Sequence, residues 1–517
     1  MKNEIENSLK DKRFYYIVLA GLFFGLIAHL YGIVNIIRNH DSWDCMASYG
    51  AGVSSGRWGL SLLGNFIQKT YGTPNLSFFN GIIAIVLLIL SSYYIIKIFD
   101  IKSPLLCVLW AGLFVGFPVV TSTMMYTFTV HYYALAVFLT VFSVYLSFKN
   151  KNKWWPLLSI FFGAFSLGIY QGYFPMMITL YLLILIKKSF TEKTSFKEIF
   201  LLGVKYVCSL ILVLIFYYLI LQLIMTIFSI ELTTYKGINT MGRMTFSQFT
   251  NSIITAFTNF FYMPVNGIAH DISCTKFLSV LFILLFIFTF LYVGYIIYIK
   301  KDNIIINQYG IIFILLLMFP MAINSIVFMC HDYIHDLMIY SWVLFFIVPI
   351  ILIDKININK NKHNPKVKKI YDKSVILIMS LILFGYLQDS NTNYTIINYA
   401  NRQANNYWNS VVTSVKQTPG FNTKLNWAFI GNVQDELYFN PWQSQNNYQL
   451  TNSNIINIYS YPNFISENLG YNIPFVSEEE QKELGKDKNI INMPCYPDYG
   501  SIKIYDDKVI VKFSNEE

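Results

Sequence analysis

Long apolar segments separated by short polar linkers fill most of the first 389 residues of the chain. A helix needs roughly 17–25 mostly apolar residues to cross the hydrocarbon of a bilayer, and about eleven segments meet that length. We therefore predict a mainly α, polytopic membrane domain over residues 1–389. The predicted spans are 14–37, 76–98, 104–122, 126–148, 154–170, 173–188, 199–229, 276–299, 309–329, 338–354 and 373–388.

Lysine and arginine collect in every second linker between these segments, and such basic linkers mark the cytoplasmic side of a membrane protein. One orientation satisfies all the clusters, with the N-terminus inside and the C-terminus outside. It exports the loop over 39–75, the turn at Gln171, the loop over 231–275 and the stretch 330–336. The basic clusters are 10–13, 97–102, 149–153, 187–193, 300–301 and 355–369.

From about residue 390 the chain becomes rich in Asn, Tyr, Gln and Ser, and no apolar run of spanning length returns. We predict that 390–517 forms a small extracytoplasmic α/β domain. Its expected elements are an amphipathic helix over 394–416, a strand in "LNWAFIGN" and a helix in "SEEEQKELG" with Ser477 as N-cap. The alternation in "SIKIYDDKVIVKF" predicts a hairpin that turns at Asp506 and Asp507.

Composition supports the membrane class. The 517 residues are 55% hydrophobic and 13% charged, with a mean hydropathy of +0.46, which excludes a chain that is soluble throughout. The net charge of +9 follows the linkers, so it indicates membrane topology and not nucleic-acid binding. The six cysteines include no CxxC pair and predict neither a zinc site nor a dense disulfide framework.

The first outer loop, "NHDSWDCMASYGAGVSSGRWG", combines Asp41, Asp44 and Arg57 with small residues. If residues 56–68 are helical, the Arg57 face opposes an apolar stripe that includes Trp58 and Phe66, which predicts an interfacial helix. Its arginine would lie at headgroup level, where the phosphate of a lipid-linked substrate would sit. In the alternative interpretation the carboxylates are solvated and the arginine only snorkels to the headgroups.

Two other outer segments carry candidate chemistry. In "CHDYIHD", His331 and His335 would share a helix face, with Asp332 beside them. HxxxH spacing alone is weak support for a metal, so we predict a phosphate-facing polar patch and no metal, with solvation of a helix end as the alternative. Tyr170 and Gln171, at a break in the helical pattern, would bind sugar hydroxyls or satisfy backbone groups freed by the kink.

The chain has no GxGxxG or P-loop motif. An enzyme whose polar candidates face outwards, and which has no nucleotide motif, needs an activated substrate that is itself lipid-linked. No cofactor is predicted.

Three stretches together resemble the bacterial glucosyl transferase GtrII family, which includes serotype-converting O-antigen glucosyltransferases. They are "DSWD" followed by "SGRWGLSLLGNF", the break "FSLGIYQGYFPMMITLYL", and the closing "NMPCYPDYGSIKIYDDKVIVKF". The resemblance implies a GT-C type of membrane fold. It also implies transfer of a hexose, expected to be glucose, from a polyprenyl-monophosphate carrier to a cell-surface glycan, on the outer face of the cytoplasmic membrane.

The same resemblance assigns roles to the candidate residues. In an inverting transfer a carboxylate takes the acceptor's proton while cations stabilise the departing phosphate. Asp44 is the expected base and Asp41 the alternative or an orienting partner. Arg57 and the patch with His331, Asp332 and His335 are expected to contact phosphate, and Tyr170 with Gln171 to contact the sugar. The expected partners are the lipid-linked donor, the glycan acceptor, the bilayer, and a companion flippase and sugar-carrier synthase.

Other classes of protein share some of these features. A flippase or transporter would have a similar number of helices, but its polar residues should lie at mid-depth instead of gathering at one face. A glycan polymerase or ligase would act on a diphosphate-linked oligosaccharide. A surface receptor without enzymatic activity would leave the first outer loop dispensable.

Overall fold

The computed structural model describes residues 10–72, 75–149, 153–191, 194–266, 275–300, 306–330, 334–355, 365–433 and 458–515. The chain divides into two compact units. Unit 1 comprises Met1–Val34 and Ala47–Asn391, and unit 2 comprises Asn35–Met46 and Thr392–Glu517. Each unit is described by itself.

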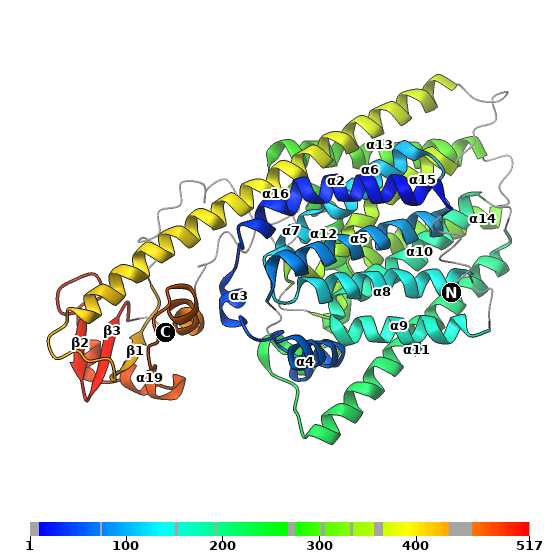
Figure 1. Ribbon diagram of the computed structural model, residues 1–517. Helices are drawn as coiled ribbons and strands as arrows, with labels where there is room; N and C mark the ends of the chain where they lie inside the picture. Colours follow the sequence, from blue (N-terminus) through cyan, green and yellow to red (C-terminus); the bar gives the residue numbers. More distant parts are fainter. Residues whose placement is uncertain are drawn as a thin grey trace. The chain divides into compact units, whose positions relative to one another are not determined.

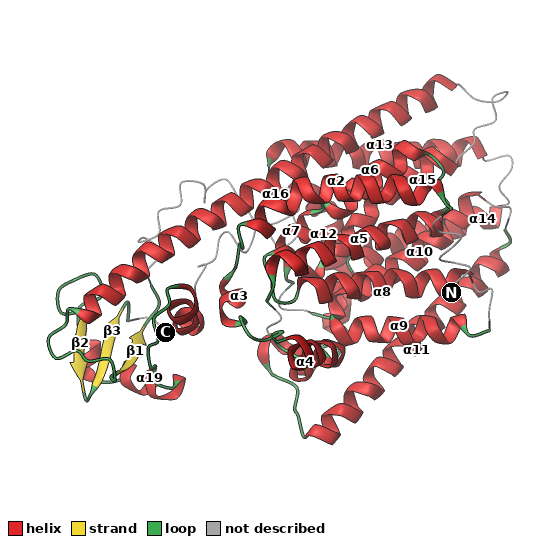
Figure 2. Cartoon of the chain, viewed as in Figure 1, coloured by secondary structure: helices red, strands yellow, loops and turns green. Residues whose placement is uncertain are grey.

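Unit 1 is helical (Figures 1 and 2). Its α-helices are α2 (Lys12–Val34), α4 (Trp58–Tyr71), α5 (Ser77–Phe99), α6 (Pro104–Val115), α7 (Pro118–Met124), α8 (Val130–Lys149), α9 (Trp155–Ile169), α10 (Phe174–Thr191), α11 (Phe196–Phe228), α12 (Phe246–Asn266), α13 (Lys276–Lys300), α14 (Ile306–Ile323), α15 (Ile347–Lys355) and the first part of α16 (Pro365–Lys416). Short 3-10 helices are η1 (Val53–Ser55), η2 (Gln171–Tyr173), η3 (Tyr235–Thr240), η4 (Ser325–Phe328), η5 (Asp336–Met338) and η6 (Tyr340–Phe346).

Helices stand at all the positions where spans were predicted, but not all of them are long enough to cross a bilayer. Among the described residues seven helices are long and apolar enough, or eight if α6 and α7, which meet at a 44° bend, form one span. Pro118 begins α7 and cannot donate the backbone hydrogen bond that would continue α6, which accounts for the bend. The segments 154–170, 309–329 and 338–354 carry shorter helices, so eleven full spans are not established.

The chain breaks at Tyr170, where "YQGYF" had left open one kinked helix or two. Helix α9 ends at Ile169, Tyr170 is extended with φ −155° and ψ 115°, and η2 then leads into α10. The structure therefore has two helices here, and Tyr170 and Gln171 are buried at the break between them.

Several of the basic linkers meet at one end of unit 1. The Arg13 guanidinium donates to the Asp100 carboxylate at 3.2 Å, and Lys355 binds the same carboxylate at 2.9 Å. The amino group of Lys187 lies 3.4 Å from the carbonyl oxygen of Ile98. These contacts gather at one end the linkers that were predicted to share the cytoplasmic side.

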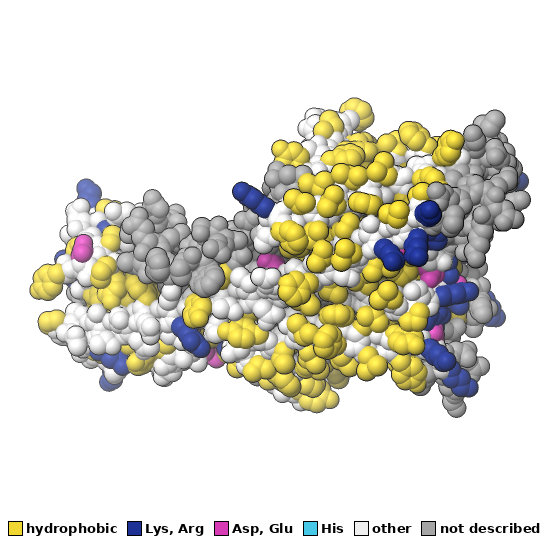
Figure 3. All heavy atoms as spheres, turned by 90° about the horizontal axis from the view of Figure 1, so that it is seen from above, with side chains coloured by type: hydrophobic (Ala, Val, Ile, Leu, Met, Phe, Trp, Pro, Cys, Tyr) yellow, Lys and Arg dark blue, Asp and Glu magenta, His cyan; other side chains and the backbone are white. Residues whose placement is uncertain are grey.

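The outer surface of unit 1 is apolar where helices face away from the bundle. On α2 and α16, Leu19, Phe23, Leu377 and Phe384 are each exposed over 60–67% of their area. Figure 3 shows a face of the unit covered mainly by hydrophobic side chains, with Lys and Arg gathered toward one end. Exposed apolar surface of this extent is typical of contact with lipid.

Unit 2 contains a three-stranded sheet in the order β1-β3-β2 (Figure 2). Strand β3 (Lys508–Lys512) pairs parallel with β1 (Asn426–Ile430) and antiparallel with β2 (Ile502–Tyr505). The remaining elements are α3 (His40–Asp44), the end of α16, η9 (Ile458–Ser460), α18 (Tyr461–Asn463), the π-helix η10 (Phe464–Asn468), α19 (Glu478–Gly485) and α20 (Lys488–Ile491).

The sheet packs on a core built around the buried Trp408 of α16, together with Phe429, Phe464 and Phe513. Three local predictions hold in this unit: the strand in "LNWAFIGN", the hairpin at Asp506 and Asp507, and the Ser477 cap, whose hydroxyl accepts from the Glu480 backbone at 3.2 Å. Residues 35–46 also belong to this unit, although they precede the expected boundary at 389 by more than three hundred residues.

Candidate active site

The acidic pair of the loop predicted to face outwards, Asp41 and Asp44, lies on the short helix α3 of unit 2. Asn39 caps the helix, with its side-chain oxygen accepting from the Ser42 backbone N–H at 2.9 Å. Asp41 and Asp44 are three residues apart, so both carboxylates project from the same turn of the helix. The Tyr459 hydroxyl donates to Asp41 Oδ1 at 2.7 Å, and Asn463 Nδ2 donates to Asp44 Oδ1 at 3.3 Å.

The two carboxylates have different environments. Partial burial and then the negative charge of Asp41 raise the pKa of Asp44 above the ordinary value of an aspartate, while the hydrogen bond from Asn463 opposes the shift. A raised pKa brings a carboxylate closer to the range in which it acts as a general base near neutral pH. This environment distinguishes Asp44 from its neighbour as the candidate base.

Trp43, between the two aspartates, anchors the helix in the core of unit 2. Its ring is 5% exposed and contacts the ring of Phe464 edge-on at 5.0 Å. The indole N–H donates to Asn401 Oδ1 at 3.3 Å, and Asn401 Nδ2 in turn donates to the Arg38 carbonyl at 3.2 Å. Hydrogen bonds and an apolar anchor therefore hold both ends of the acidic segment.

Arg57 belongs to unit 1, where a tight turn after η1 presents it. Gly56 has a φ of +73°, and a Cβ there would meet Gln171 Nε2 at 2.6 Å and the Tyr217 hydroxyl at 2.7 Å. Gln171 donates to the Ser55 carbonyl at 2.9 Å, and Tyr217 donates to the Gly56 carbonyl at 3.0 Å. The backbone before Arg57 is therefore fixed from two separate helical segments.

The Arg57 guanidinium faces aromatic rings. Nη1 donates to the Tyr133 hydroxyl at 3.2 Å, and Cζ lies 5.1 Å from the ring centroid of Tyr170, which stacks on Tyr133 at 4.4 Å. No carboxylate forms an ion pair with Arg57 among the described residues, and its buried Nε has no hydrogen-bond partner there. An arginine held in this way retains capacity to bind an anion.

Tyr170 and Gln171 support this arginine. Tyr170 is 3% exposed and its ring lies beside the guanidinium, while the amide N–H groups of Gln171 go to Ser55 and to the Tyr217 hydroxyl at 3.0 Å. Both residues therefore position Arg57. Their contact with a sugar stays a prediction.

The "CHDYIHD" stretch is described only in part, since His331 and Asp332 lie outside the described residues. His335 has extended backbone and precedes η5, so the helix assumed for the pair does not include it. Its Nδ1 accepts from the Leu337 N–H at 3.3 Å, and its Nε2 lies 3.2 Å from the Tyr126 hydroxyl. His335 caps η5, which packs against η2 directly after Tyr170, so His335 lies in the same part of unit 1 as the Arg57 cluster.

The sequence interpretation missed several members of this cluster. Tyr133 and Tyr217 each lie within a predicted span. A hydroxyl group in an otherwise apolar segment was the sequence signal that could have identified them. Asp336 stands in the quoted "CHDYIHD" stretch, but sequence spacing cannot show that it is 1% exposed. Long-range packing brings Tyr133 to Arg57 and Tyr217 to the neighbouring Gly56.

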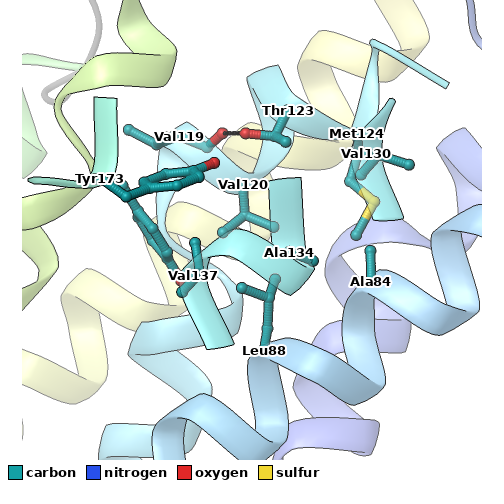
Figure 4. Close-up of a pocket in the computed structure, with 11 residues that line it drawn as sticks. Ala84, Leu88, Val119, Val120, Thr123, Met124, Val130, Ala134, Val137 and Tyr173 are labelled. Carbon is teal, nitrogen blue, oxygen red and sulfur yellow. Dashed lines mark hydrogen bonds between the residues drawn. The ribbon is translucent and has the colours of Figure 1, made fainter. Parts of the chain in front are cut away.

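A small cavity lies beside the aromatic cluster inside unit 1 (Figure 4). Tyr173, whose ring centroid is 5.2 Å from that of Tyr170, lines one side. The hydroxyl of Thr123 donates to the Val119 carbonyl at 2.7 Å, and the other walls are mainly aliphatic. This lining suits apolar atoms and offers little to a sugar or a phosphate.

The structure thus brings together two sets of predicted residues. Asp41 and Asp44 share unit 2, while Arg57, Tyr170, Gln171 and His335 share one end of unit 1. The earlier expectation that both sets serve one site stays a prediction.

The sequence profile of the glucosyl transferase GtrII family matches residues 30–348, which is more than half of the chain. The chain belongs to the GtrII family. No curated protein and no solved structure matches it. The GtrII match contains every predicted site residue and ends before the closing "NMPCYPDYG" stretch that the resemblance had included.

Membership in GtrII identifies the protein as a glycosyltransferase with membrane helices. An enzyme of this family is favoured over the flippase and receptor interpretations of the same helices and loops. The clusters around Asp44 and Arg57 are therefore candidates for the chemistry of glucosyl transfer.

Proposed function

We propose that this GtrII glucosyl transferase moves a hexose, expected to be glucose, from a polyprenyl-monophosphate carrier to a cell-surface glycan such as an O-antigen. The reaction takes place on the outer face of the cytoplasmic membrane and inverts the anomeric carbon. The lipid carrier suits a protein with several apolar helices and no nucleotide-binding motif.

The main support is the placement of Arg57. Its partner Tyr133 lies near the start of α8, and Lys149 ends the same helix beside the basic linkers. Sixteen residues of α-helix at about 1.5 Å each give roughly 24 Å, close to the thickness of the hydrocarbon core. This length supports a position for Arg57 near the opposite polar boundary, where the phosphate of an embedded carrier would be found.

The proposed reaction forms one bond and breaks one. The acceptor hydroxyl loses its proton to a carboxylate while its oxygen attacks the anomeric carbon. The bond between that carbon and the carrier's phosphate oxygen breaks, and the polyprenyl phosphate leaves with an additional negative charge. A guanidinium at that oxygen stabilises the charge as it develops.

Asp44 is the proposed base, with Asp41 as the alternative or as the group that orients it. Arg57 is the proposed phosphate ligand, supported by His335, and His331 and Asp332 keep their predicted roles there. Tyr170 and Gln171 keep their predicted role toward the sugar. The two aspartates and Arg57 belong to different units, so each assignment is tested by its own variant.

The proposed partners follow from this reaction. The carrier must be loaded with sugar by a synthase on the cytoplasmic side and turned over by a flippase before it reaches this enzyme. The C-terminal unit is proposed to be extracytoplasmic and to take part in selecting the acceptor glycan.

The test uses the purified full chain in lipid nanodiscs with three donors: a polyprenyl-phosphate hexose, a nucleotide hexose and a polyprenyl-diphosphate oligosaccharide. Transfer from the first donor alone is expected, and NMR of the product should show the inverted anomer. Transfer only from the diphosphate donor would instead identify a polymerase or ligase. Transfer from the nucleotide sugar would remove the argument for a lipid carrier.

Variants then test the residues. Asp44→Asn should lower kcat by about 10²–10⁴-fold, the usual contribution of a general base. Arg57→Ala should cost about 10²-fold or more, as expected on loss of a group that stabilises developing charge. The matched controls are Glu479→Gln and Arg402→Ala, two exposed residues of unit 2. Full activity in Asp44→Asn or Arg57→Ala would exclude the corresponding role.

A further inference from the structure

The carboxylate of Asp336 is buried in unit 1 and poorly satisfied. The residue is 1% exposed. Its Oδ2 accepts one long hydrogen bond, from the Ser122 hydroxyl at 3.4 Å, and its Oδ1 has no partner among the residues that the structure describes. A buried carboxylate in this condition destabilises the fold unless further donors reach it.

A capping function does not account for this side chain. Asp336 is the first residue of η5, but the cap is supplied by His335, whose Nδ1 accepts from the Leu337 N–H at 3.3 Å. No lysine or arginine forms an ion pair with Asp336 among the described residues. Within the part of the chain that the structure describes, Asp336 Oδ1 is therefore an acceptor without a donor.

The position of Asp336 connects it with the Arg57 cluster. Helix η5 packs against α7 and against η2, which follows Tyr170 directly. The Tyr170 ring centroid lies 5.1 Å from Arg57 Cζ, and η5 begins at Asp336, so the packing of η5 on η2 brings Asp336 toward the segment that follows Tyr170. In this part of unit 1, Arg57 Nε is a donor and Asp336 Oδ1 an acceptor that have no hydrogen-bond partner among the described residues.

A ligand that satisfies both atoms carries an anionic group and, close to it, a hydrogen-bond donor. A carboxylate repels phosphate, so the donor cannot be the phosphate itself. In a sugar phosphate the ring hydroxyls meet this requirement, and aromatic rings are common in sites that hold such rings.

We propose that Asp336 accepts a hydrogen bond from a ring hydroxyl of the donor hexose and thereby selects the sugar whose phosphate Arg57 binds. This inference rests on the proposed function, because it assumes the lipid-phosphate sugar as donor. Asp336 is assigned to recognition and takes no proton in the transfer. A site built to bond a hydroxyl discriminates strongly against sugars that lack it, since the buried acceptor is then left unpaired.

The test compares Asp336→Asn with Ser122→Ala, which removes the described hydrogen bond to Asp336 without touching the carboxylate. Asp336→Asn should raise KM for the polyprenyl-phosphate hexose by about tenfold or more, as expected for a lost hydrogen bond to a charged group. Its affinity for sugar-free polyprenyl phosphate should stay unchanged. Ser122→Ala should change neither quantity by more than about threefold.

A series of monodeoxy donors locates the hydroxyl. On the wild-type enzyme one deoxy donor should show a KM raised by about tenfold, and Asp336→Asn should add little to that penalty because the same contact is already lost. For a variant that does not fold in nanodiscs, the wild-type series decides alone. Equal KM values for all the deoxy donors would overturn the proposal.

Two further outcomes separate this inference from the proposed function. In the first outcome, the wild type binds polyprenyl phosphate, but Asp336→Asn lowers the affinity for the sugar-free carrier as much as the affinity for the sugar-loaded donor. Asp336 then has a structural role, and only this inference fails. If the wild type binds no polyprenyl phosphate at all, the proposed donor class fails and the inference falls with it.

Discussion

The Tyr459 hydroxyl donates a hydrogen bond to Asp41 Oδ1 at 2.7 Å, joining residues that are 418 positions apart in the chain. Asp44, a turn further along α3, accepts instead from Asn463, and burial and then the charge of Asp41 raise its pKa. The two aspartates of "DSWD" therefore differ in environment despite their similar setting in the sequence. This difference favours Asp44 as the base and Asp41 as the residue that shapes its charge state.

The pH dependence of catalysis should report this pair. A base works only when ionised, so kcat/KM should rise with pH through the pKa of Asp44, and that pKa lies above the ordinary aspartate value because of burial and then Asp41. Asp41→Asn removes the neighbouring negative charge, so the acidic limb of the profile should move to lower pH. The profile is measured from initial rates with the lipid-linked donor.

Glu478→Gln is the matched control for that shift, because Glu478 also raises the pKa of Asp44, but less strongly than Asp41 does. Its acidic limb should move in the same direction by a smaller amount. An acidic limb that stays in place in Asp41→Asn would show that Asp44 is not the group that titrates in the profile.

Stability should change in the opposite direction to activity at Asp44. Because folding raises its pKa, the ionised carboxylate is less favourable in the folded state than in the unfolded state. The favourable contribution of the Asp44 carboxyl group to the free energy of unfolding is present at low pH. It is lost as the pH rises through the folded-state pKa of this group. Asp44→Asn, which keeps an oxygen for the Asn463 bond, should therefore be more stable than wild type at pH 7 by less than about 1 kcal/mol.

The measurement is the melting temperature of the full chain in nanodiscs across a pH series. The difference between Asp44→Asn and wild type should disappear as the pH falls below the ordinary pKa of an aspartate, since both side chains are then neutral. A variant that is less stable than wild type at pH 7 would contradict the assigned direction.

Trp43 should hold the acidic segment in unit 2. Trp43→Ala removes a side chain that is 5% exposed and packs on Phe464, so unit 2 should lose about 3–5 kcal/mol. Hydrogen exchange of the backbone amides over 39–45 should rise at the same time. Tyr499→Ala, which removes a fully exposed aromatic ring of the same unit, should change stability by less than about 0.5 kcal/mol.

Features of the fold that depend on nearby residues were predictable from the sequence. The hairpin at Asp506 and Asp507 forms because both residues take positive φ, 46° and 57°, as a two-residue turn between strands requires. Ser477 precedes three glutamates and caps α19 as its sequence context indicates. Apolar segments likewise marked the places of the helices, although length separates the full spans from the shorter pieces.

Features that depend on distant contacts were not predictable from one sequence. The indole of Trp43 donates a hydrogen bond to Asn401, which is 358 positions away in the chain. No local sequence pattern indicates that residues 35–46 fold with the C-terminal unit. Trp58 was placed in the lipid-facing stripe of its helix, yet it is 5% exposed because it packs against Gly168, where a Cβ would lie 2.5 Å from the indole. The burial of Asp336 belongs to the same category.

The turn before Arg57 allows a test of positioning without altering the arginine itself. Gly56→Ala places a methyl group 2.6 Å from Gln171 Nε2 and 2.7 Å from the Tyr217 hydroxyl, at a backbone φ of +73°. Displacing these partners should shift the guanidinium and reduce kcat/KM by about 10²-fold, since misplacement by about 1 Å can have that effect.

Gly72→Ala is the matched control, because its φ is +91° but nothing lies within 4 Å of the added methyl group. Both variants carry the strain of a non-glycine residue at positive φ, and Gly56→Ala should in addition lose the stability of the contacts that it displaces. Only Gly56→Ala should lose activity, and an equal effect on kcat/KM in both variants would show that backbone strain, and not the placement of Arg57, limits the enzyme.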